Sequence, residues 1–436
     1  MTVNSLPLGG TQKALQTHAL ELVRSGHEVR VVAVGEGGPR AKRLSDGGAE
    51  VVIADGNRHR LAEMLQGADV VHMYRDGIGE RMAPAACRAA GIELLVESNI
   101  FGAVDVSPDE AQFSCHLLPS KFCALRYRWR TGIEMAPFHA RHRVSYWPVD
   151  VDRIRGNAPP PDQAKRALGL DPTRPVVGRI GRADDRKWRN IIVDMVPHLL
   201  ELVPEVQVAM VGATPAKLRR LERLGVLDRT RLFEPTADEA ELAAMYAACD
   251  VFVTAAEIGE SHSYAIEEAM TLGVPVVTCS TPWVDNAQIE QIDEGVTGHV
   301  ANHPRAFAEA VASIVSDPER RRRLGEAGRR KAESLYDSKP LTEQLVRLYD
   351  SLLRDGSVPE EWSPDLEEVD AFEQEYERRL TAQYRTPTPK ERREIEIDRI
   401  RERAAWAARA AISTANPKGM ATIYWAARAR LARARR

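Results

Sequence analysis

The chain has 436 residues, of which 44% are hydrophobic, so it is too long for one ordinary core and predicts two domains with additional segments. Its formal net charge of −3 argues against a nucleic-acid-binding protein. Five widely spaced cysteines without a C-x-x-C pair favour reduced thiols over a disulfide scaffold or a zinc site. Residues 1–10 have no signal-peptide pattern and no run of 18 apolar residues occurs, so we expect a cytoplasmic protein for which only peripheral membrane contact is open.

Short Val-rich runs alternate with amphipathic stretches over most of the chain. Strands are predicted at residues 2–6, 29–34, 51–54, 70–73, 92–96, 144–147, 176–180, 206–211, 251–254 and 274–278. Helices are predicted at residues 12–25, 191–202, 239–248, 304–316 and 340–353. Continuous apolar strands that alternate with helices are typical of parallel sheets covered on both faces. The predicted fold class is therefore α/β, doubly wound.

The alternation is interrupted at residues 150–162, which include Gly156, Asn157 and three consecutive prolines. Such a composition is typical of a semi-rigid linker. We therefore predict two Rossmann-like domains, residues 1–155 and 156–336. A closing helix at 337–354 is expected to return to the first domain, and residues 355–436 form a charged helical extension.

The extension changes from acidic to basic along its length. Residues 355–377 contain ten acidic side chains and no basic one, whereas residues 404–436 contain seven basic side chains and no acidic one. Helices are predicted to open at Pro364, Pro389 and Pro417. The last, residues 417–436, is basic and amphipathic, so it could lie on an anionic membrane or pack against the acidic helix 364–380.

The most informative segment is 257–275, EIGESHSYAIEEAMTLGVP, which lies between two predicted strands. Glu260 is expected in a loop and Glu268 two turns into a helix. The two glutamates are eight residues apart, and eight residues of helix span about 12 Å. That distance is close to the reach from a hexose across a diphosphate to a ribose. The helix start at residues 261–263 offers free amides to an anion. The alternative is a surface helix with scattered glutamates.

Two further loops contain residue types suited to phosphates. Residues 178–189, GRIGRADDRKWR, follow a strand and place Arg182 and Lys187 where ligands of parallel sheets bind. A guanidinium and an ammonium together suit a diphosphate. Gly9 and Gly10 follow the first strand, and glycines there allow a close backbone approach to a phosphate or sugar. Each loop taken alone is equally consistent with solvated charges or a plain turn.

Taken in order, these three segments resemble the GT-B retaining glycosyltransferases of family 4. The pattern is an early Gly-Gly loop, G-R-x4-K after the linker, and E-x7-E-A-M-x-x-G-x-P-V-V. Further similar segments are R-S-G-H-E-V at 24–29 and the closing E-x4-G-x-x-G that begins at Glu290. The resemblance covers residues 4–353. It implies two Rossmann-like domains that face a cleft, the first for the acceptor and the second for the donor.

The resemblance also implies roles for individual residues. Arg182 and Lys187 would neutralise the diphosphate of a nucleotide sugar, Glu268 would hold the ribose hydroxyls, and Glu260 would lie beside the transferred sugar. Gly10 would approach the donor from the first domain. The family implies retention of anomeric configuration and no cofactor or metal. The acceptor would be a glycan, a lipid-linked molecule or a small molecule.

The chain departs from the family pattern in three places. Glycines that flank an aromatic in the family are replaced by Ser261, His262 and Ser263, which we expect near the donor, with packing as the alternative for His262. Residues 97–102 replace the family's usual histidine at the end of a first-domain strand, so acceptor handling does not transfer. Residues 280–290 replace a glycine-rich loop, and there Asn286 and Gln288 are candidate sugar or phosphate contacts.

Residues 121–130, KFCALRYRWR, interleave aromatic side chains with arginines. The spacing of Phe122, Leu125 and Trp129 favours a helix with one buried face over a nucleic-acid contact. Other functions remain open at this stage: a nucleotide-sugar epimerase, a glycan phosphorylase, or a non-catalytic sugar-binding or scaffold protein on the same fold. Retention of both glutamates together with Arg182 and Lys187 favours an enzyme.

Overall fold

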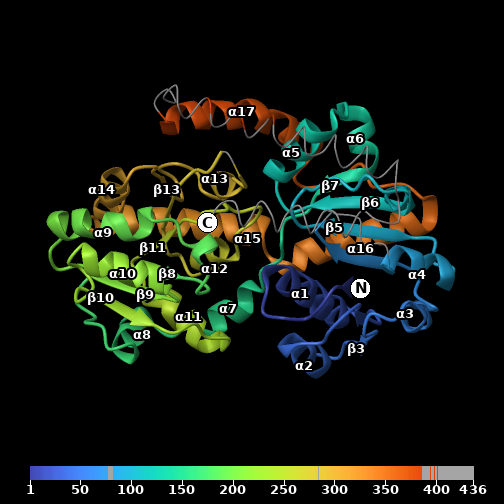
Figure 1. Cartoon of the computed structure of the whole chain (residues 1–436), viewed down its shortest axis with the longest axis horizontal. Coiled ribbons are helices and arrows are strands. Elements are labelled where there is room, and N and C mark those ends of the chain that lie inside the picture. Colours follow the sequence, from blue (N-terminus) through green and yellow to red (C-terminus); the bar gives the residue numbers. More distant parts are fainter. Residues whose placement is uncertain (77–81, 283, 385–392, 394–396, 398–399, 401–436) are drawn as a thin grey trace.

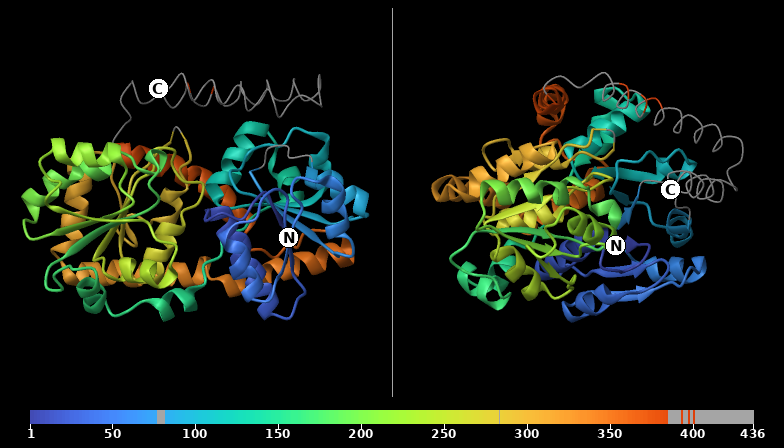
Figure 2. Two further views of the ribbon diagram at one scale, coloured as in Figure 1. Left: turned by 60° about the horizontal axis from the view of Figure 1, so that its bottom comes forward. Right: turned by 60° about the vertical axis from the view of Figure 1, so that its left-hand side comes forward.

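The computed structural model describes residues 1–76, 82–282, 284–384, 393, 397 and 400. Within this part of the chain, two separate sheets form two lobes that lie side by side (Figure 1). Helices cover the faces of both sheets, as two further views show (Figure 2). The predicted α/β class with two doubly wound units is confirmed.

The first lobe is built on a parallel sheet that has seven strands within the described residues, in the order β3-β2-β1-β4-β5-β6-β7. Its strands are β1 (Thr2–Val3), β2 (Arg30–Ala33), β3 (Glu50–Ile53), β4 (Val71–Arg75), β5 (Leu95–Asn99), β6 (Phe113–Leu118) and β7 (His142–Val144). Its helices are α1 (Gly10–Arg24), α2 (Pro39–Asp46), α3 (Arg58–Leu65), α4 (Met82–Ala90), α5 (Lys121–Thr131) and α6 (Met135–Arg141).

The second lobe is built on a parallel sheet that has six strands in the described part of the chain, in the order β10-β9-β8-β11-β12-β13. Its strands are β8 (Val176–Ile180), β9 (Gln207–Val211), β10 (Thr230–Phe233), β11 (Val251–Thr254), β12 (Val276–Thr278) and β13 (Gly298–Val300). Its helices are α8 (Pro161–Ala167), α9 (Ile191–Leu202), α10 (Pro215–Arg223), α11 (Glu239–Ala247), α12 (Tyr264–Thr271), α13 (Gln288–Gln291), α14 (Pro304–Val315) and α15 (Pro318–Leu335).

The central strands agree best with the predicted runs because they are buried on both faces. Strands β8 and β11 begin and end where the Val-rich runs predict. Strands β6, β10 and β13 were not predicted. Strand β10 lies at a sheet edge with Arg231 and Leu232 exposed, so no continuous apolar run marks it. Ser114 and His116 interrupt the apolar pattern of β6 in the same way.

The segment 150–162, predicted as a semi-rigid linker without secondary structure of its own, contains helix α7 (Val151–Asn157) and the start of α8. The Asp150 side chain caps α7 by accepting a hydrogen bond from the backbone N–H of Arg153 at 3.0 Å. Pro161 occupies the first turn of α8, where a missing N–H costs nothing. Prolines that suggested a linker therefore start a helix.

Two long helices follow the second lobe. Helix α16 (Ser338–Asp355) packs against α1, and its Leu345, Leu348 and Leu352 join Val96 and Leu117 of the first sheet in one apolar cluster. Helix α17 (Leu366–Tyr384) lies across the top of Figure 1, above the boundary between the lobes. The predicted helices that open at Pro389 and Pro417 lie outside the described residues. No helix in the described part is long and apolar enough to cross a membrane.

Candidate functional site

The predicted loops of the second lobe meet at one edge of its sheet. Strands β8, β11 and β12 are neighbours, and their carboxyl ends lead into the loops that carry Lys187, Glu260 and Asn286. Because carboxyl ends of neighbouring parallel strands share an edge, residues far apart in the sequence converge there. The strand order alone therefore brings these three loops to one edge of the second sheet.

Lys187 and Glu260 form a direct ion pair at this edge. Lys187 Nζ donates to Glu260 Oε2 at 2.7 Å, with the two side chains 24% and 14% exposed. Lys187 ends a short 3-10 turn, Asp185–Lys187, after β8. Arg182, in the same loop, is exposed and makes no side-chain hydrogen bond or ion pair with any other described residue. One predicted cation is thus held against a predicted carboxylate, and the other is available to an incoming anion.

Glu268 pairs with a lysine of the opposite lobe. Its carboxylate accepts a hydrogen bond from Lys13, which lies in the first turns of α1. The Lys13 ammonium also lies 4.9 Å from the ring centroid of Tyr264, the first residue of α12. Burial and then the charge of Glu268 raise the pKa of Tyr246, on α11, well above its ordinary value. Glu268 therefore faces the first lobe, not solvent.

Gly10 lies where the two lobes touch. It is the first residue of α1, and a Cβ placed on it would lie 3.0 Å from Trp147 Cζ3 and 3.7 Å from Tyr264 Cδ2. Trp147 and Tyr264 stack with ring centroids 5.3 Å apart. The glycine thus allows the start of α1 to approach the start of α12 closely.

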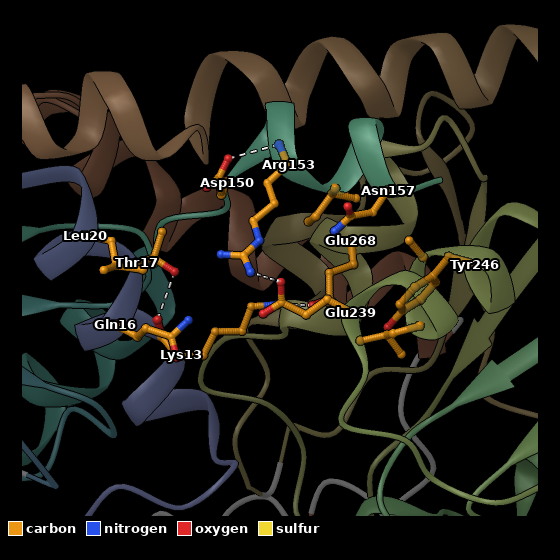
Figure 3. A pocket seen from close by; sticks show the side chains of 13 residues that line it. Lys13, Gln16, Thr17, Leu20, Asp150, Arg153, Asn157, Glu239, Tyr246 and Glu268 are labelled. Atoms are coloured by element: carbon orange, nitrogen blue, oxygen red, sulfur yellow. Dashed lines mark hydrogen bonds and ion pairs between the residues drawn. The ribbon is translucent and has the colours of Figure 1, made fainter. Parts of the chain in front are cut away.

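A cavity opens beside Glu268, between helices α1, α7, α11 and α12 (Figure 3). Its volume is about 610 Å³, which includes the solvent at its mouth. Lys13 and Glu268 lie at one side, and Arg153 points across it to Glu239 at 2.7 Å. Glu239 also pairs with Arg43 of the first lobe at 2.6 Å. The Lys187–Glu260 pair lies outside this cavity, which reaches only the Glu268 end of the site.

The segment before α12 is less accessible than the sequence suggested. The Ser263 amide donates to Gln291 Oε1 at 3.1 Å, and the Ser261 carbonyl accepts from Ser120 Oγ at 2.9 Å. The Ser263 amide is therefore not free, which corrects the prediction of a free backbone amide at that residue. The His262 imidazole is fully buried and hydrogen-bonded to Glu267. Its side chain packs in the core, so the packing alternative describes it.

Asn286 and Gln288 also have internal partners. Asn286 is fully buried, and its Oδ1 accepts from the Thr281 amide at 2.7 Å. Gln288 Nε2 donates to the Cys279 carbonyl at 3.1 Å, and its Oε1 accepts from the Glu260 amide at 3.2 Å. The expectation of sugar or phosphate contacts is wrong for these amides, because burial commits them to holding their own loop.

Glu97, the first residue of the segment that replaces the family's histidine, is part of a buried ionic cluster. Its carboxylate accepts from Arg75 Nε at 2.6 Å and also pairs with His116. Burial opposes ionisation, but the charge of Arg75 and the His116 hydrogen bond outweigh it and lower the pKa of Glu97 to about 2. This carboxylate is a structural anion in the first lobe.

Sequence reasoning missed Lys13 as a site residue and did not foresee the contacts of Glu290. The Glu290 carboxylate, in the second lobe, accepts from the backbone amides of Lys121 and Phe122 at 3.0 and 3.1 Å, at the start of α5 in the first lobe. It also accepts from Tyr146 Oη at 2.8 Å. A carboxylate at a helix N-terminus is favoured by the helix dipole. Lys13 lines the cavity together with Gln16, Thr17 and Leu20 of α1, but this helical spacing does not predict its contact with Glu268.

Solved glycosyltransferases share this two-lobed architecture. Anabaena Alr3699/HepE in complex with UDP and glucose superposes with a TM-score of 0.65 at 17% identity, covering 80% of this chain and 98% of that one. A glycosyltransferase from Rickettsia africae superposes with a TM-score of 0.66 at 14% identity, covering 81% of this chain and 98% of that one. Such low identity establishes the fold alone, and that fold is GT-B.

Residues 161–331 match the family model described as glycosyl transferases group 1, so this chain contains a domain of that family. Relatives include spore coat protein SA of Bacillus subtilis, 25% identical over 53% of this chain and 61% of that protein. The D-inositol 3-phosphate glycosyltransferase of Segniliparus rotundus is 28% identical over 50% of this chain and 51% of that protein. Phosphatidyl-myo-inositol mannosyltransferase of Mycobacterium leprae is 29% identical over 41% of this chain and 47% of that protein. The chain spans about half the length of the relatives it matches.

Proposed function

We propose that this protein transfers a sugar from a nucleoside diphosphate sugar to an acceptor hydroxyl. The observation that carries the proposal is that both predicted carboxylates are paired with lysines, one of them a lysine of the opposite lobe, and that a further cation is exposed on the loop of Lys187. Glu260 faces Lys187 and Glu268 faces Lys13, with Arg182 exposed on the loop that holds Lys187. A plain surface helix with scattered glutamates would not place both carboxylates against lysines of other elements.

In this proposal the charge of the leaving group governs the chemistry. A nucleoside diphosphate gains negative charge as the glycosidic bond breaks, and fixed cations in a closed site stabilise that charge best. Arg182 and Lys187 would bind the diphosphate. Lys187 would exchange its contact with Glu260 for a phosphate oxygen, which leaves the Glu260 carboxylate beside the sugar. Glu268 would accept hydrogen bonds from the ribose hydroxyls, and Gly10 would border the donor.

We further propose that the anomeric configuration is retained and that neither a cofactor nor a metal is required. Arg182 and Lys187 would take the place of a metal at the diphosphate. One structural neighbour binds UDP and glucose, and two relatives carry names that denote inositol-containing acceptors. For this chain we propose a hexosyl donor, with a glycan, lipid-linked molecule or small molecule as acceptor.

A donor screen tests the proposal. Thermal unfolding is measured with UDP-, GDP- and ADP-sugars, and a donor at 100 times its dissociation constant should add roughly 2.7 kcal/mol of stability. Release of the nucleoside diphosphate without acceptor then separates turnover from binding. Binding without release, both alone and with glycan, lipid-linked and small-molecule acceptors, would indicate a non-catalytic protein, and conversion of the donor sugar alone would indicate an epimerase. An inverted product by NMR, or loss of activity in EDTA, would contradict retention or metal independence.

The basic segment 417–436 lies outside the described residues, and we propose it as a peripheral contact to the inner face of a cell membrane. Each basic residue near an anionic surface adds about 1 kcal/mol of binding free energy. Full-length protein should sediment with anionic liposomes at low salt and be released at high salt. Equal sedimentation of a chain truncated after Ala415 would refute this role.

A further inference from the structure

Helix α17 lies outside the segment that matches the family model, yet it contacts both lobes. On the first lobe, Glu373 accepts from Trp129 Nε1 at 2.8 Å, and Glu368 pairs with Lys121 at 2.9 Å. On the second lobe, Arg379 donates to the Ile289 carbonyl at 2.6 Å. Figure 1 shows the helix above both α5 and α13. The helix therefore makes polar contacts with both lobes.

Tyr376 is the residue of α17 that reaches deepest into this boundary. It is 1% exposed and lies in one apolar cluster with Phe122 and Ile289, which belong to different lobes. Its ring centroid is 5.6 Å from that of Phe122 and 5.7 Å from that of Trp129. Its hydroxyl accepts a hydrogen bond from Asn286 Nδ2 at 3.1 Å. One side chain of the extension thus reaches the loop of the second lobe beside the candidate site.

Asn286 connects that hydroxyl to the backbone around Glu260. The next residue, Ala287, donates its amide to the Glu260 carbonyl at 2.8 Å. The Glu260 amide in turn donates to Gln288 Oε1 at 3.2 Å. Both peptide groups of Glu260 are therefore held by residues that directly follow Asn286.

The fit between the two loops is close at Gly259 as well. A Cβ on Gly259 would lie 1.6 Å from the Asp285 carbonyl oxygen, so the loops are in backbone contact there. A displacement of residues 284–288 must consequently displace Glu260. Packed contacts of this kind transmit small shifts, because interiors are as dense as organic crystals.

We propose that Tyr376 is a positioning residue, which fixes Glu260 beside the transferred sugar through Asn286 and the 284–288 segment. The inference rests on the role that the proposed function gives to Glu260. It makes the appended helix part of the catalytic apparatus, since α17 would determine how well Glu260 is placed without touching the donor. The donor contacts proposed for Arg182 and Glu268 do not involve this connection.

The test compares full-length Tyr376→Phe with Tyr349→Phe as a matched control. Tyr376→Phe removes the hydroxyl and keeps the ring packing. Tyr349→Phe also removes a hydrogen-bonded, partly buried hydroxyl, which lies 2.6 Å from His72 Nδ1 in the first lobe. Steady-state donor turnover, donor-binding stoichiometry and hydrogen–deuterium exchange of the peptides covering residues 256–263 and 284–291 are measured for both variants and the native protein.

We expect Tyr376→Phe to lower kcat about fivefold per intact donor site, which corresponds to about 1 kcal/mol, and to leave the donor KM unchanged. Exchange should become faster at the amides of Glu260 and Ala287, and Tyr349→Phe should show neither effect. Equal kcat in the two variants, or unchanged exchange in Tyr376→Phe, would overturn the inference. If the native protein turns over no donor, the proposed function fails, and the exchange comparison still decides whether Tyr376 holds the Glu260 loop.

Discussion

Lys187→Ala is the most direct test of the diphosphate site. Among the described residues, the Lys187 ammonium donates a hydrogen bond to the partly buried Glu260 carboxylate and to no other group. A charge-assisted contact contributes about 1.5–3 kcal/mol in the ground state, which corresponds to a loss of roughly 10- to 150-fold in donor affinity. The loss in kcat/KM should be larger, because charge on the leaving group grows in the transition state.

A neighbouring residue provides the matched control. Arg186 is in the same loop, but its side chain is 67% exposed and pairs with Asp184 at 2.9 Å. Exposed pairs of this kind contribute about 0–1 kcal/mol, so Arg186→Ala should leave the kinetic constants nearly unchanged. Both variants should remain folded, since both side chains lie on a loop at the edge of the sheet.

The assay follows release of the nucleoside diphosphate from the donor found in the thermal screen, over a range of donor concentrations. Circular dichroism confirms that each variant is folded at the assay temperature. The reasoning is refuted if Lys187→Ala has kcat/KM within about twofold of Arg186→Ala, a difference of about 0.4 kcal/mol in transition-state stabilisation.

Three further predictions use the same measurements. Glu268→Ala should raise the donor KM, because contacts to the ribose are equal in the ground and transition states. Glu260→Gln should lower kcat, because contacts to the reacting sugar differ between those states. Reversed effects would exchange the roles of the two glutamates. Gly259 has φ +62° and faces a backbone oxygen, so Gly259→Ala should lower kcat and reduce the free energy of unfolding by more than about 2 kcal/mol. Gly295 has φ +72° but faces open space, so Gly295→Ala should reduce the free energy of unfolding by about 1 kcal/mol and leave the activity unchanged. Glu97 has a folded pKa of about 2 against 4.5 in the unfolded chain, so the stability it provides above pH 4.5 is lost as the pH falls to about 2. Urea unfolding between pH 7 and pH 3 should therefore show a shallower acid loss in Glu97→Gln, by about 2 kcal/mol, and identical slopes would contradict the ionised state.

Much of the fold was predictable because its signals are local. Continuous apolar runs mark strands buried on both faces, and so β8, β11 and helix α9 lie where their sequence periods place them. The loops after β8 and β11 could also be located, since a parallel sheet brings the carboxyl ends of its strands to one edge. Lys187 and Glu260 are 73 positions apart in the chain, and the family resemblance already implied that both border the same donor.

Tertiary structure alone decided which side chains reach that edge. Lys13 and Glu268 are 255 positions apart on different lobes, and no periodicity within α1 or α12 contains information about such a contact. Asn286 has a polar, loop-like sequence context, yet Tyr376 of α17 covers it and makes it part of the core. Local sequence determines the period of hydrophobic burial. The partner of a polar side chain instead depends on which distant element packs over it, because buried polar atoms form their hydrogen bonds in the assembled fold.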